Sequence, residues 1–401
     1  MSNKIMTVFT ASYPFGKRET YFENELVFLS KAFDKVYIVP IYNPTKSGIR
    51  RVVPENVIVI EPILKQGIGR FIEGIGCFKY NSLWISDFFS GKVYKSIFRF
   101  KKWINSWMLY SKGLSVLIKM DLPKNSYLYS YWAEIPFFVS DEISSFKRIV
   151  RMHGGDFYLN RNNGYLPLRS KIYQTADLLL PISKDIQETL LNHYEISKSK
   201  IFLSYLGVFN NVGTCSIQTM DKKIRFVSCS NVYGLKRVHL IYDVLLAMNE
   251  NIQIEWHHFG DGDLMGNLKE YINERIQPNI TFVLYGHLNQ KQIEEMYENN
   301  YYDWFINTSQ YEGLPVSIME SFSYGIPAIA TNVGGTSEIV NDQNGFLINT
   351  EIGLRELVEK LENIERSDYF NKRIKAYETW LNKFEAKQNY EKMTNRFFEI
   401  N

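Results

Sequence analysis

The sequence has few cysteines and no long apolar run, and both absences exclude whole classes of protein. Its three cysteines, Cys77, Cys215 and Cys229, are far apart and outside any CxxC pair. We therefore expect neither a disulfide framework nor a zinc site, and a cytoplasmic location. No run of about 18 apolar residues occurs, and the N-terminus lacks a charged region followed by an apolar one. We expect no transmembrane helix and no secretory signal, so any membrane contact would be peripheral.

Charge and composition also exclude some partners. The formal net charge is only +3 over 401 residues, and charged residues make up 22% of the chain. A nucleic-acid partner is not expected on this balance. Hydrophobic residues make up 45%, which allows each of two or three domains of ordinary size to bury a core.

Short apolar runs alternate with amphipathic stretches along most of the chain. Strands that alternate with helices predict βαβ units and parallel sheets. The polar stretch 210–222, after which the pattern restarts, predicts a linker between two doubly wound halves. The runs that we interpret as strands are Ile5–Thr10, Val36–Pro40, Tyr127–Tyr131, Arg148–Met152, Leu178–Pro181, Ile201–Tyr205, Ile224–Ser228, Ile254–Phe259, Ile280–Leu284, Trp304–Asn307 and Ala328–Thr331.

The strongest functional signal lies in residues 304–340, which read WFINTSQYEGLPVSIMESFSYGIPAIATNVGGTSEIV. After a strand and a loop, a helix opens near Pro315, a residue suited to a first helical turn. The amides exposed at this turn are those of Gly313, Leu314 and Val316. They lie at the positive end of the helix dipole, which favours an anion. Two carboxylates flank the turn, Glu312 before the helix and Glu320 inside it.

This segment resembles the Glu-x7-Glu signature of glycosyltransferase family 4, including the flanking pattern EG.P....ES...G.P.IAT..GG..EIV. The resemblance implies an α/β GT-B fold, in which two Rossmann-like domains face each other across a cleft. It implies a retaining transferase that uses a nucleotide-sugar donor. It also implies that Glu320 binds the ribose hydroxyls and Glu312 contacts the donor sugar. The amides of Gly313, Leu314 and Val316 would then face the diphosphate.

Two further motifs resemble elements of the same family. The stretch RMHGGD resembles the family's R.HG.D element, which implies that His153 lies at the donor sugar as a catalytic-centre residue. The stretch FVSCSNVYGLKRVH resembles a phosphate-binding element in which an Arg is followed, six residues on, by a Lys. Lys236 matches the Lys, whereas Ser230 stands at the Arg position and supplies no charge. Arg237 is the candidate for the compensating charge.

Weaker signals complete the predicted site. Gly16 follows the first strand and resembles the family's phosphate or acceptor loop, and Gly286 follows a strand as in the nucleotide-side loops. No DxD-like cluster lies beside these elements except Asp261 and Asp263, which form a GDGD turn of the family's usual type. We therefore expect that no metal or other cofactor is required. No side chain is an evident covalent nucleophile, so retention rests on the resemblance alone.

The predicted organisation has four parts. Residues 1–209 form an acceptor-side domain, 210–222 a linker, and 223–378 the nucleotide-sugar-binding domain. Residues 379–401, with Trp380 and Phe384, form a helix that packs back on the N-terminal domain.

The expected substrates are a nucleotide-diphosphate sugar donor and a glycan or lipid-linked acceptor, in the biosynthesis of a surface polysaccharide. Two alternatives stay open. One is an epimerase or phosphorylase on the same architecture, which explains Glu312 and Glu320 less well. The other is a non-catalytic partner protein, which Ser230 favours and the intact His153 disfavours. A dehydrogenase is not expected, because no GxGxxG opens the first βα turn.

Residues 91–120 carry seven basic and no acidic side chains. Apolar residues recur there at steps of three and four, and Lys95, Arg99 and Lys102 fall on the opposite face. The apolar positions are Tyr94, Ile97, Phe98, Ile104, Trp107 and Met108. Such a basic amphipathic helix suits an anionic membrane surface, which predicts peripheral binding at the inner face of the membrane. Alternatively, the apolar stripe packs on the first domain and the cations face water.

Overall fold

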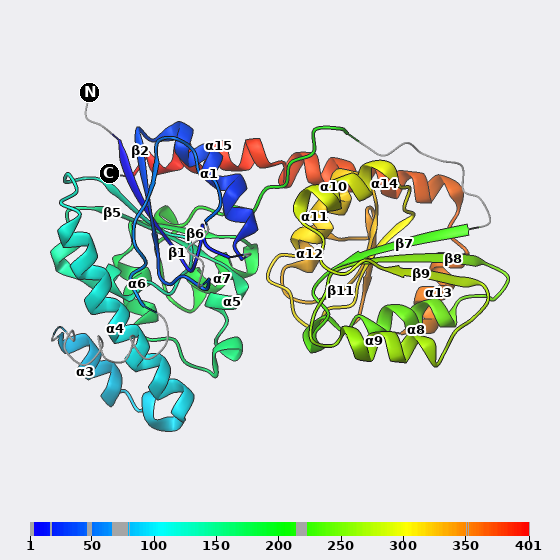
Figure 1. Cartoon of the computed structure of the whole chain (residues 1–401), viewed down its shortest axis with the longest axis horizontal. Helices are drawn as coiled ribbons and strands as arrows, with labels where there is room; N and C mark the ends of the chain where they lie inside the picture. Colours follow the sequence, from blue (N-terminus) through cyan, green and yellow to red (C-terminus); the bar gives the residue numbers. More distant parts are fainter. Residues whose placement is uncertain are drawn as a thin grey trace. The chain divides into compact units, whose positions relative to one another are not determined.

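The computed structural model describes residues 4–16, 18–45, 50–65, 79, 81–213, 223–349, 351 and 353–400. The chain divides into two compact units (Figure 1). The first unit comprises residues 1–207 and 388–401, and the second unit comprises residues 208–387.

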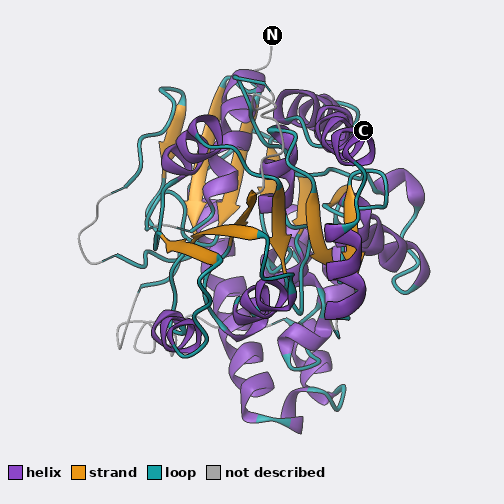
Figure 2. Cartoon of the chain, turned by 90° about the vertical axis from the view of Figure 1, so that its right-hand side faces the viewer, coloured by secondary structure: helices purple, strands orange, loops and turns teal. Residues whose placement is uncertain are grey.

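The first unit is built on a parallel sheet with the strand order β3-β2-β1-β4-β5-β6. Its strands are β1 (Ile5–Thr10), β2 (Lys35–Pro40), β3 (Val57–Val59), β4 (Tyr127–Ser130), β5 (Lys147–Met152) and β6 (Leu178–Pro181). The strands β4 and β6 are buried at every position, as expected where helices cover both faces of a parallel sheet. Figure 2 shows the helices (purple) and the strands (orange) of the chain.

The helices of the first unit include one from the far end of the chain. They are α1 (Thr20–Ala32), α3 (Ser82–Phe89), α4 (Ile97–Lys119), α5 (Gly154–Phe157), α6 (Arg169–Thr175), α7 (Lys184–Asn192) and α15 (Ala386–Phe397). Tyr390 of α15 packs against Phe28 of α1, with 5.5 Å between ring centroids. Met393 accepts a contact from the buried guanidinium of Arg151, which also pairs with Glu25 at 3.2 Å. The last helix therefore completes the core of the first unit.

The second unit repeats the scheme, with the strand order β12-β11-β10-β7-β8-β9. Its strands are β7 (Lys223–Cys229), β8 (Gln253–Phe259), β9 (Ile280–Leu284), β10 (Trp304–Asn307), β11 (Ala328–Thr331) and β12 (Gly345–Ile348). Its helices are α8 (His239–Ala247), α9 (Met265–Asn273), α10 (Gln290–Asn299), α11 (Val316–Ser323), α12 (Thr336–Ile339), α13 (Leu354–Glu362) and α14 (Arg366–Lys383). All the strand pairs are parallel.

The predicted pair of doubly wound parallel sheets is confirmed, and the edge strands β3 and β12, which were not predicted, complete the two sheets. Two further points differ from the prediction. Ile201–Tyr205 is not a full strand: it makes one parallel bridge, Leu179 to Ile201, beside β6. Just beyond this segment, the backbone bonds to α15 and not to β6: the amide of Gly207 donates a hydrogen bond to the hydroxyl of Tyr390. Most of the predicted linker, residues 214–222, lies outside the described residues.

The second difference concerns the C-terminal boundary, which falls at residue 388 and not at 379. Trp380 and Phe384 stay with the second unit, because both bond to the backbone of Val208. The indole of Trp380 donates to the carbonyl of Val208 at 3.0 Å. The amide of Val208 donates to the carbonyl of Phe384 at 2.9 Å. Only the helix α15 that follows packs on the first unit.

Candidate functional site

Lys236 and Glu312 meet at the carboxyl edge of the second unit's sheet. Lys236 closes a short 3-10 turn (Gly234–Lys236) after β7, and Glu312 lies in the loop after β10. The ammonium of Lys236 donates to Oε1 of Glu312 at 2.5 Å, and the amide of Asn307 donates to the same oxygen at 3.3 Å. Both side chains are largely buried, with exposed fractions of 19% and 11%. Two residues 76 positions apart, predicted to serve phosphate and sugar, thus lie side by side.

Arg237 connects the same two loops. Its backbone is in the left-handed region, at φ 47, and its Nε donates to the carbonyl of Thr308 at 2.9 Å. The hydroxyl of Thr308 donates in return to the carbonyls of Lys236 and Arg237. This exchange fixes the turn that carries Lys236. Whether Arg237 also takes the role of the arginine missing at Ser230 stays a prediction.

The amides that were predicted to bind an anion lie at the start of α11 (Val316–Ser323), and their anion-binding role stays a prediction. Within the described residues, no group accepts a hydrogen bond from the amides of Gly313, Leu314 or Val316. The loop is held from behind, because the amide of Gly335 donates to the carbonyl of Gly313 at 2.9 Å. Gly334 has a φ of +51, and a Cβ there would lie 1.9 Å from the carbonyl oxygen of Glu312. Only glycine allows this approach, so the GG pair shapes the loop that presents the three amides.

Glu320 is buried on α11, one turn beyond this anion site, with an exposed fraction of 5%. Its Oε1 accepts a hydrogen bond from the side-chain amide of Gln290, on α10, at 3.0 Å. Burial raises the pKa of Glu320 to about 7, the bond from Gln290 opposes that rise, and the charge of Glu294 adds to it. A buried carboxyl with one donor has room for further hydrogen bonds, as the resemblance requires for ribose hydroxyls.

Gly286 has a structural role in the neighbouring loops. Its φ is +72, and its carbonyl accepts from the amide of Gly260 at 2.8 Å, which joins the loops after β8 and β9. A Cβ at Gly260 would lie 1.9 Å from the carbonyl oxygen of Ser230. The loop after β8 therefore packs directly on the end of β7.

His153 follows β5 in the first unit. Its ring lies on Trp132 and Tyr131, with centroid distances of 4.5 Å and 4.9 Å. Neither ring nitrogen has a hydrogen-bond partner among the described residues. Burial, followed by the charge of Arg151, lowers the pKa of His153 well below its usual range. The imidazole is therefore neutral at physiological pH.

Asp156 holds the backbone around His153. Its carboxylate accepts from the amide of His153 at 2.7 Å and from that of Ala133 at 2.6 Å. Burial raises the pKa of Asp156 to about 7, and the charge of Arg169 opposes the rise. Asp156 belongs to the same RMHGGD motif as His153. Its positioning role also depends on Ala133, in the loop after β4, which is distant in sequence.

The loop after β1 is held in shape by the carboxylate of Glu19. Glu19 accepts hydrogen bonds from three consecutive amides, those of Ala11, Ser12 and Tyr13, at 2.9, 2.7 and 2.7 Å. It also accepts from the indole of Trp132 at 2.6 Å. Gly16 turns the same loop at a φ of +73, and its carbonyl accepts from Arg51. These amides serve Glu19, and a ligand-binding role for Gly16 stays a prediction.

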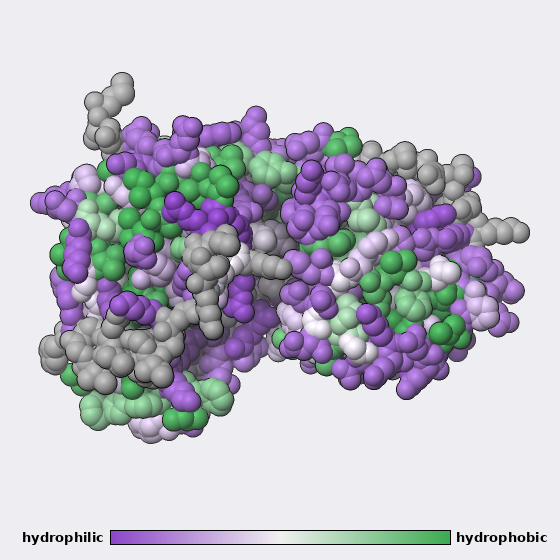
Figure 3. All heavy atoms as spheres, viewed as in Figure 1, coloured by the Kyte–Doolittle hydropathy of each residue, from purple (hydrophilic) through white to green (hydrophobic). Residues whose placement is uncertain are grey.

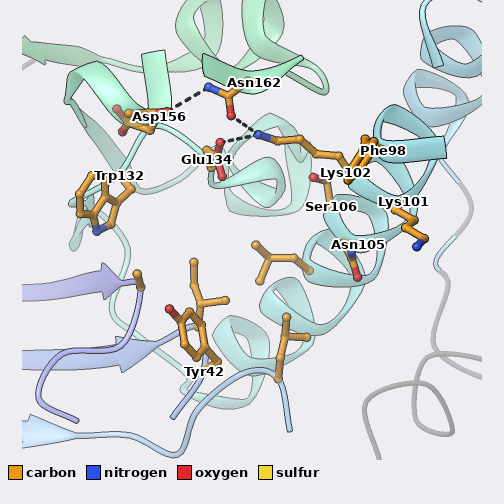
Figure 4. Close-up of a pocket in the computed structure, with 15 residues that line it drawn as sticks. Tyr42, Phe98, Lys101, Lys102, Asn105, Ser106, Trp132, Glu134, Asp156 and Asn162 are labelled. Carbon is orange, nitrogen blue, oxygen red and sulfur yellow. Dashed lines mark hydrogen bonds and ion pairs between the residues drawn. The ribbon is translucent and has the colours of Figure 1, made fainter. Parts of the chain in front are cut away.

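A pocket of about 640 Å³ lies beside this loop, inside the first unit (Figure 4). Its walls come from the loops after β1, β2, β3 and β4, from α4, and from α5 with the turn that follows it. The lining residues are Ala11, Ile41, Tyr42, Leu64, Phe98, Lys101, Lys102, Asn105, Ser106, Leu109, Trp132, Glu134, Gly155, Asp156 and Asn162. Lys102 donates to Glu134 at 2.8 Å and to the side-chain oxygen of Asn162 at 2.5 Å. The pocket thus combines one apolar wall with a fixed polar cluster.

The sequence is similar to those of known glycosyltransferases. Residues 216–379 match the family model described as "Glycosyl transferases group 1". The chain is 28% identical to the O-antigen biosynthesis glycosyltransferase WbnH of Escherichia coli over 205 residues, which cover 50% of this chain and 54% of that protein. The chain therefore matches only about half the length of this curated relative.

Solved structures match over the whole chain. The lipopolysaccharide outer core galactosyltransferase WaaB has a TM-score of 0.69 at 18% identity and 99% coverage of both chains. HepE of Anabaena, in complex with UDP and glucose, has a TM-score of 0.63 at 12% identity, covering 99% of this chain and 100% of that one. The chain has the GT-B fold.

The sequence alone missed two features of this GT-B chain, the carboxylate of Glu19 and the 640 Å³ pocket. A carboxylate soon after the first strand was visible, but its partner Trp132 lies 113 residues away. In the described part of the chain, no three His, Cys, Asp or Glu side chains gather as metal ligands. No helix there has the length and apolar character needed to span a bilayer.

Proposed function

We propose that this protein is a retaining glycosyltransferase of surface polysaccharide biosynthesis. It would move a sugar from a nucleotide-diphosphate donor to a glycan or lipid-linked acceptor, without a metal, at the cytoplasmic face of the membrane. One observation carries the proposal: Lys236, Glu312 and the amides that start α11 gather at one edge of the second unit. The family match over residues 216–379 and the resemblance to WbnH support it.

The charges at this edge suit departure of a nucleoside diphosphate. As the bond between sugar and phosphate breaks, negative charge develops on the leaving group. Lys236, the three amides and the positive end of α11 supply fixed positive potential there, which lowers the barrier electrostatically. Lys236 is paired with Glu312 at 2.5 Å. It reaches the diphosphate by exchanging a carboxylate for a phosphate oxygen, with little change in its charge environment.

The other proposed roles are assigned to buried polar groups of the two units and to the pocket. Glu320 accepts hydrogen bonds from the ribose hydroxyls, because its carboxyl is buried and has one donor, Gln290. In the first unit, neutral His153 offers a ring nitrogen to the donor sugar, and Asp156 keeps the backbone in place. The 640 Å³ pocket in the same unit receives the acceptor.

The test is a donor screen combined with one substitution. Hydrolysis and transfer are measured with UDP-, GDP- and ADP-sugars, starting with UDP-sugars because HepE was solved with UDP and glucose. Lys236→Ala should lower turnover by about 100-fold or more, since one fixed donor to the leaving group is lost. The nucleotide should still bind.

The matched control is Lys291→Ala, which removes an exposed lysine from α10 in the same unit. It should behave as the unsubstituted protein. If no nucleotide sugar binds, or if Lys236→Ala turns over at the full rate, the proposed catalytic edge is wrong. Binding without any turnover would favour the non-catalytic partner protein.

A further inference from the structure

The end of the first unit where α3 stops and α4 starts exposes an unusual amount of apolar surface. We call residues 89–101 the α3–α4 tip. The exposed fractions of its large apolar side chains are 75% for Phe89, 67% for Tyr94, 61% for Ile97 and 67% for Phe98. Figure 1 shows this tip at the lower end of the first unit, and Figure 3 shows apolar side chains at the same end.

The tip is also positively charged. Lys92, Lys95 and Lys101 are exposed, and the sequence has no acidic residue between Asp87 and Asp121. Asp87 is itself half-buried and accepts a hydrogen bond from the hydroxyl of Tyr165. Burial raises the pKa of Asp87, although that bond and Lys92 oppose the rise. Asp87 therefore interacts with Lys92, and α3 and α4 contain no other acidic residue that could neutralise Lys95 or Lys101.

The rest of α4 is not available to a partner, which corrects the picture of a helix lying flat on a surface. Beyond its first turns, α4 is packed into the first unit through residues including Trp103, Met108, Leu109, Leu114 and Leu117. Two of the three cations expected on a free face also serve the fold. Arg99 donates to the carbonyl of Asn163 at 2.7 Å, and Lys102 pairs with Glu134 at 2.8 Å.

The packed part of α4 holds the tip in place. Trp84 of α3 is fully buried, and its ring stacks on that of Trp107 with 6.1 Å between centroids. Trp103 packs against both rings, with centroid distances of 6.3 Å to Trp84 and 5.1 Å to Trp107. Helices joined by three indoles present the tip as a preformed surface, so binding there does not require the helices to fold.

We propose that the α3–α4 tip inserts into the headgroup region of an anionic phospholipid bilayer. Aromatic side chains favour this region, and lysines beside them interact with anionic headgroups. Phe98 and Lys101 belong to the tip and also line the 640 Å³ pocket. The bilayer surface and the pocket are therefore adjacent, which brings the head of a lipid-linked acceptor to the pocket. Only the lipid-linked acceptor is taken from the proposed function; membrane binding by the tip does not depend on it.

Vesicle sedimentation tests whether the tip binds membranes, with substitutions that avoid Phe98 and Lys101 because these two residues also line the pocket. The full chain is mixed with vesicles of phosphatidylcholine alone or with phosphatidylglycerol added. Each lysine near an anionic surface contributes roughly fivefold to partitioning. Lys92→Glu with Lys95→Glu should therefore weaken binding to anionic vesicles by about 25-fold or more. Phe89→Ser with Tyr94→Ser should also weaken binding, including any that remains at high salt.

Matched controls make the same changes elsewhere. Lys171→Glu with Lys198→Glu reverses two exposed charges of the first unit, and Ile276→Ser with Ile374→Ser removes exposed apolar side chains of the second unit. These variants should bind vesicles as the unsubstituted protein does. Equal binding to neutral and anionic vesicles, or equal losses in tip and control variants, would overturn the proposal. So would a tip that binds RNA and no vesicles.

Hydrolysis of the donor in solution separates this inference from the proposed function. The four tip substitutions should leave it unchanged, because none of these residues lines the pocket or the Lys236 site. Donor hydrolysis without vesicle binding would refute the tip and leave the transferase standing. Vesicle binding that depends on the tip, in a protein that binds no nucleotide sugar, would refute the transferase and leave the tip.

Discussion

Donor binding should depend on pH through Glu320. The pKa of this carboxyl is raised to about 7 by burial, and ribose hydroxyls form stronger hydrogen bonds with its ionised form. Binding below pH 7 must therefore release a proton. With a pKa of about 7, the ionised fraction falls about 25-fold between pH 7.5 and pH 5.5, and donor affinity should fall with it. Near pH 6, about one proton should be released per donor bound.

Isothermal titration calorimetry measures both quantities. A UDP-sugar is titrated at several pH values and in two buffers of different ionisation enthalpy, which reports the protons released. In Glu320→Gln the pH dependence should disappear, because the amide does not titrate. Asp156→Asn is the matched control, since burial raises the pKa of Asp156 to about 7 as well. It should keep the full dependence.

Stability gives an independent check on the same group. A carboxyl whose pKa is raised on folding destabilises the native state as pH rises from its ordinary value, 4.5, to about 7. The cost above that window is about 3 kcal/mol. Glu320→Gln should therefore gain stability relative to the unsubstituted protein at pH 8 and not at pH 4.5. Donor binding that is independent of pH, or equally dependent in Glu320→Gln, would refute this account of Glu320.

Two further predictions concern the chemistry. His153→Ala should lower turnover by about 100-fold while the nucleotide still binds, with exposed His193→Ala as the control; full transferase activity in His153→Ala would show that the ring has no catalytic role. Activity should survive EDTA, because Lys236 and the amides before α11 supply the positive potential; loss of activity with rescue by one divalent metal would contradict this.

The sequence predicted those parts of the structure that depend on neighbouring residues. The strand Ile5–Thr10 was predicted with the bounds that it has, because a buried parallel strand is a continuous apolar run. The loop from Glu312 to Val316 was recognisable because its carboxylate, glycine and helix start are contiguous. The 2.5 Å contact of Lys236 with Glu312 was not, since it joins loops that only the sheet order brings together.

The first unit shows the same limit more strongly. Glu19 and Trp132, which frame the loop beside His153, contact each other across 113 positions. The basic helix was predicted from periodicity, but periodicity does not tell which turns are packed. Met108 is 5% exposed and Phe98 is 67% exposed, although both fall on the predicted apolar stripe. The difference arises because Met108 lies on the part of α4 that is packed into the first unit, whereas Phe98 lies in its first turn.

The discontinuity of the first unit has a consequence for the order of folding during synthesis. Its core needs α15, whose Tyr390 and Met393 reach Phe28 and the buried Arg151. The second unit, residues 208–387, is complete in sequence before most of that helix has been synthesised. A nascent chain therefore finishes its second unit while the first still lacks one helix, with Arg151 and Glu25 only partly enclosed.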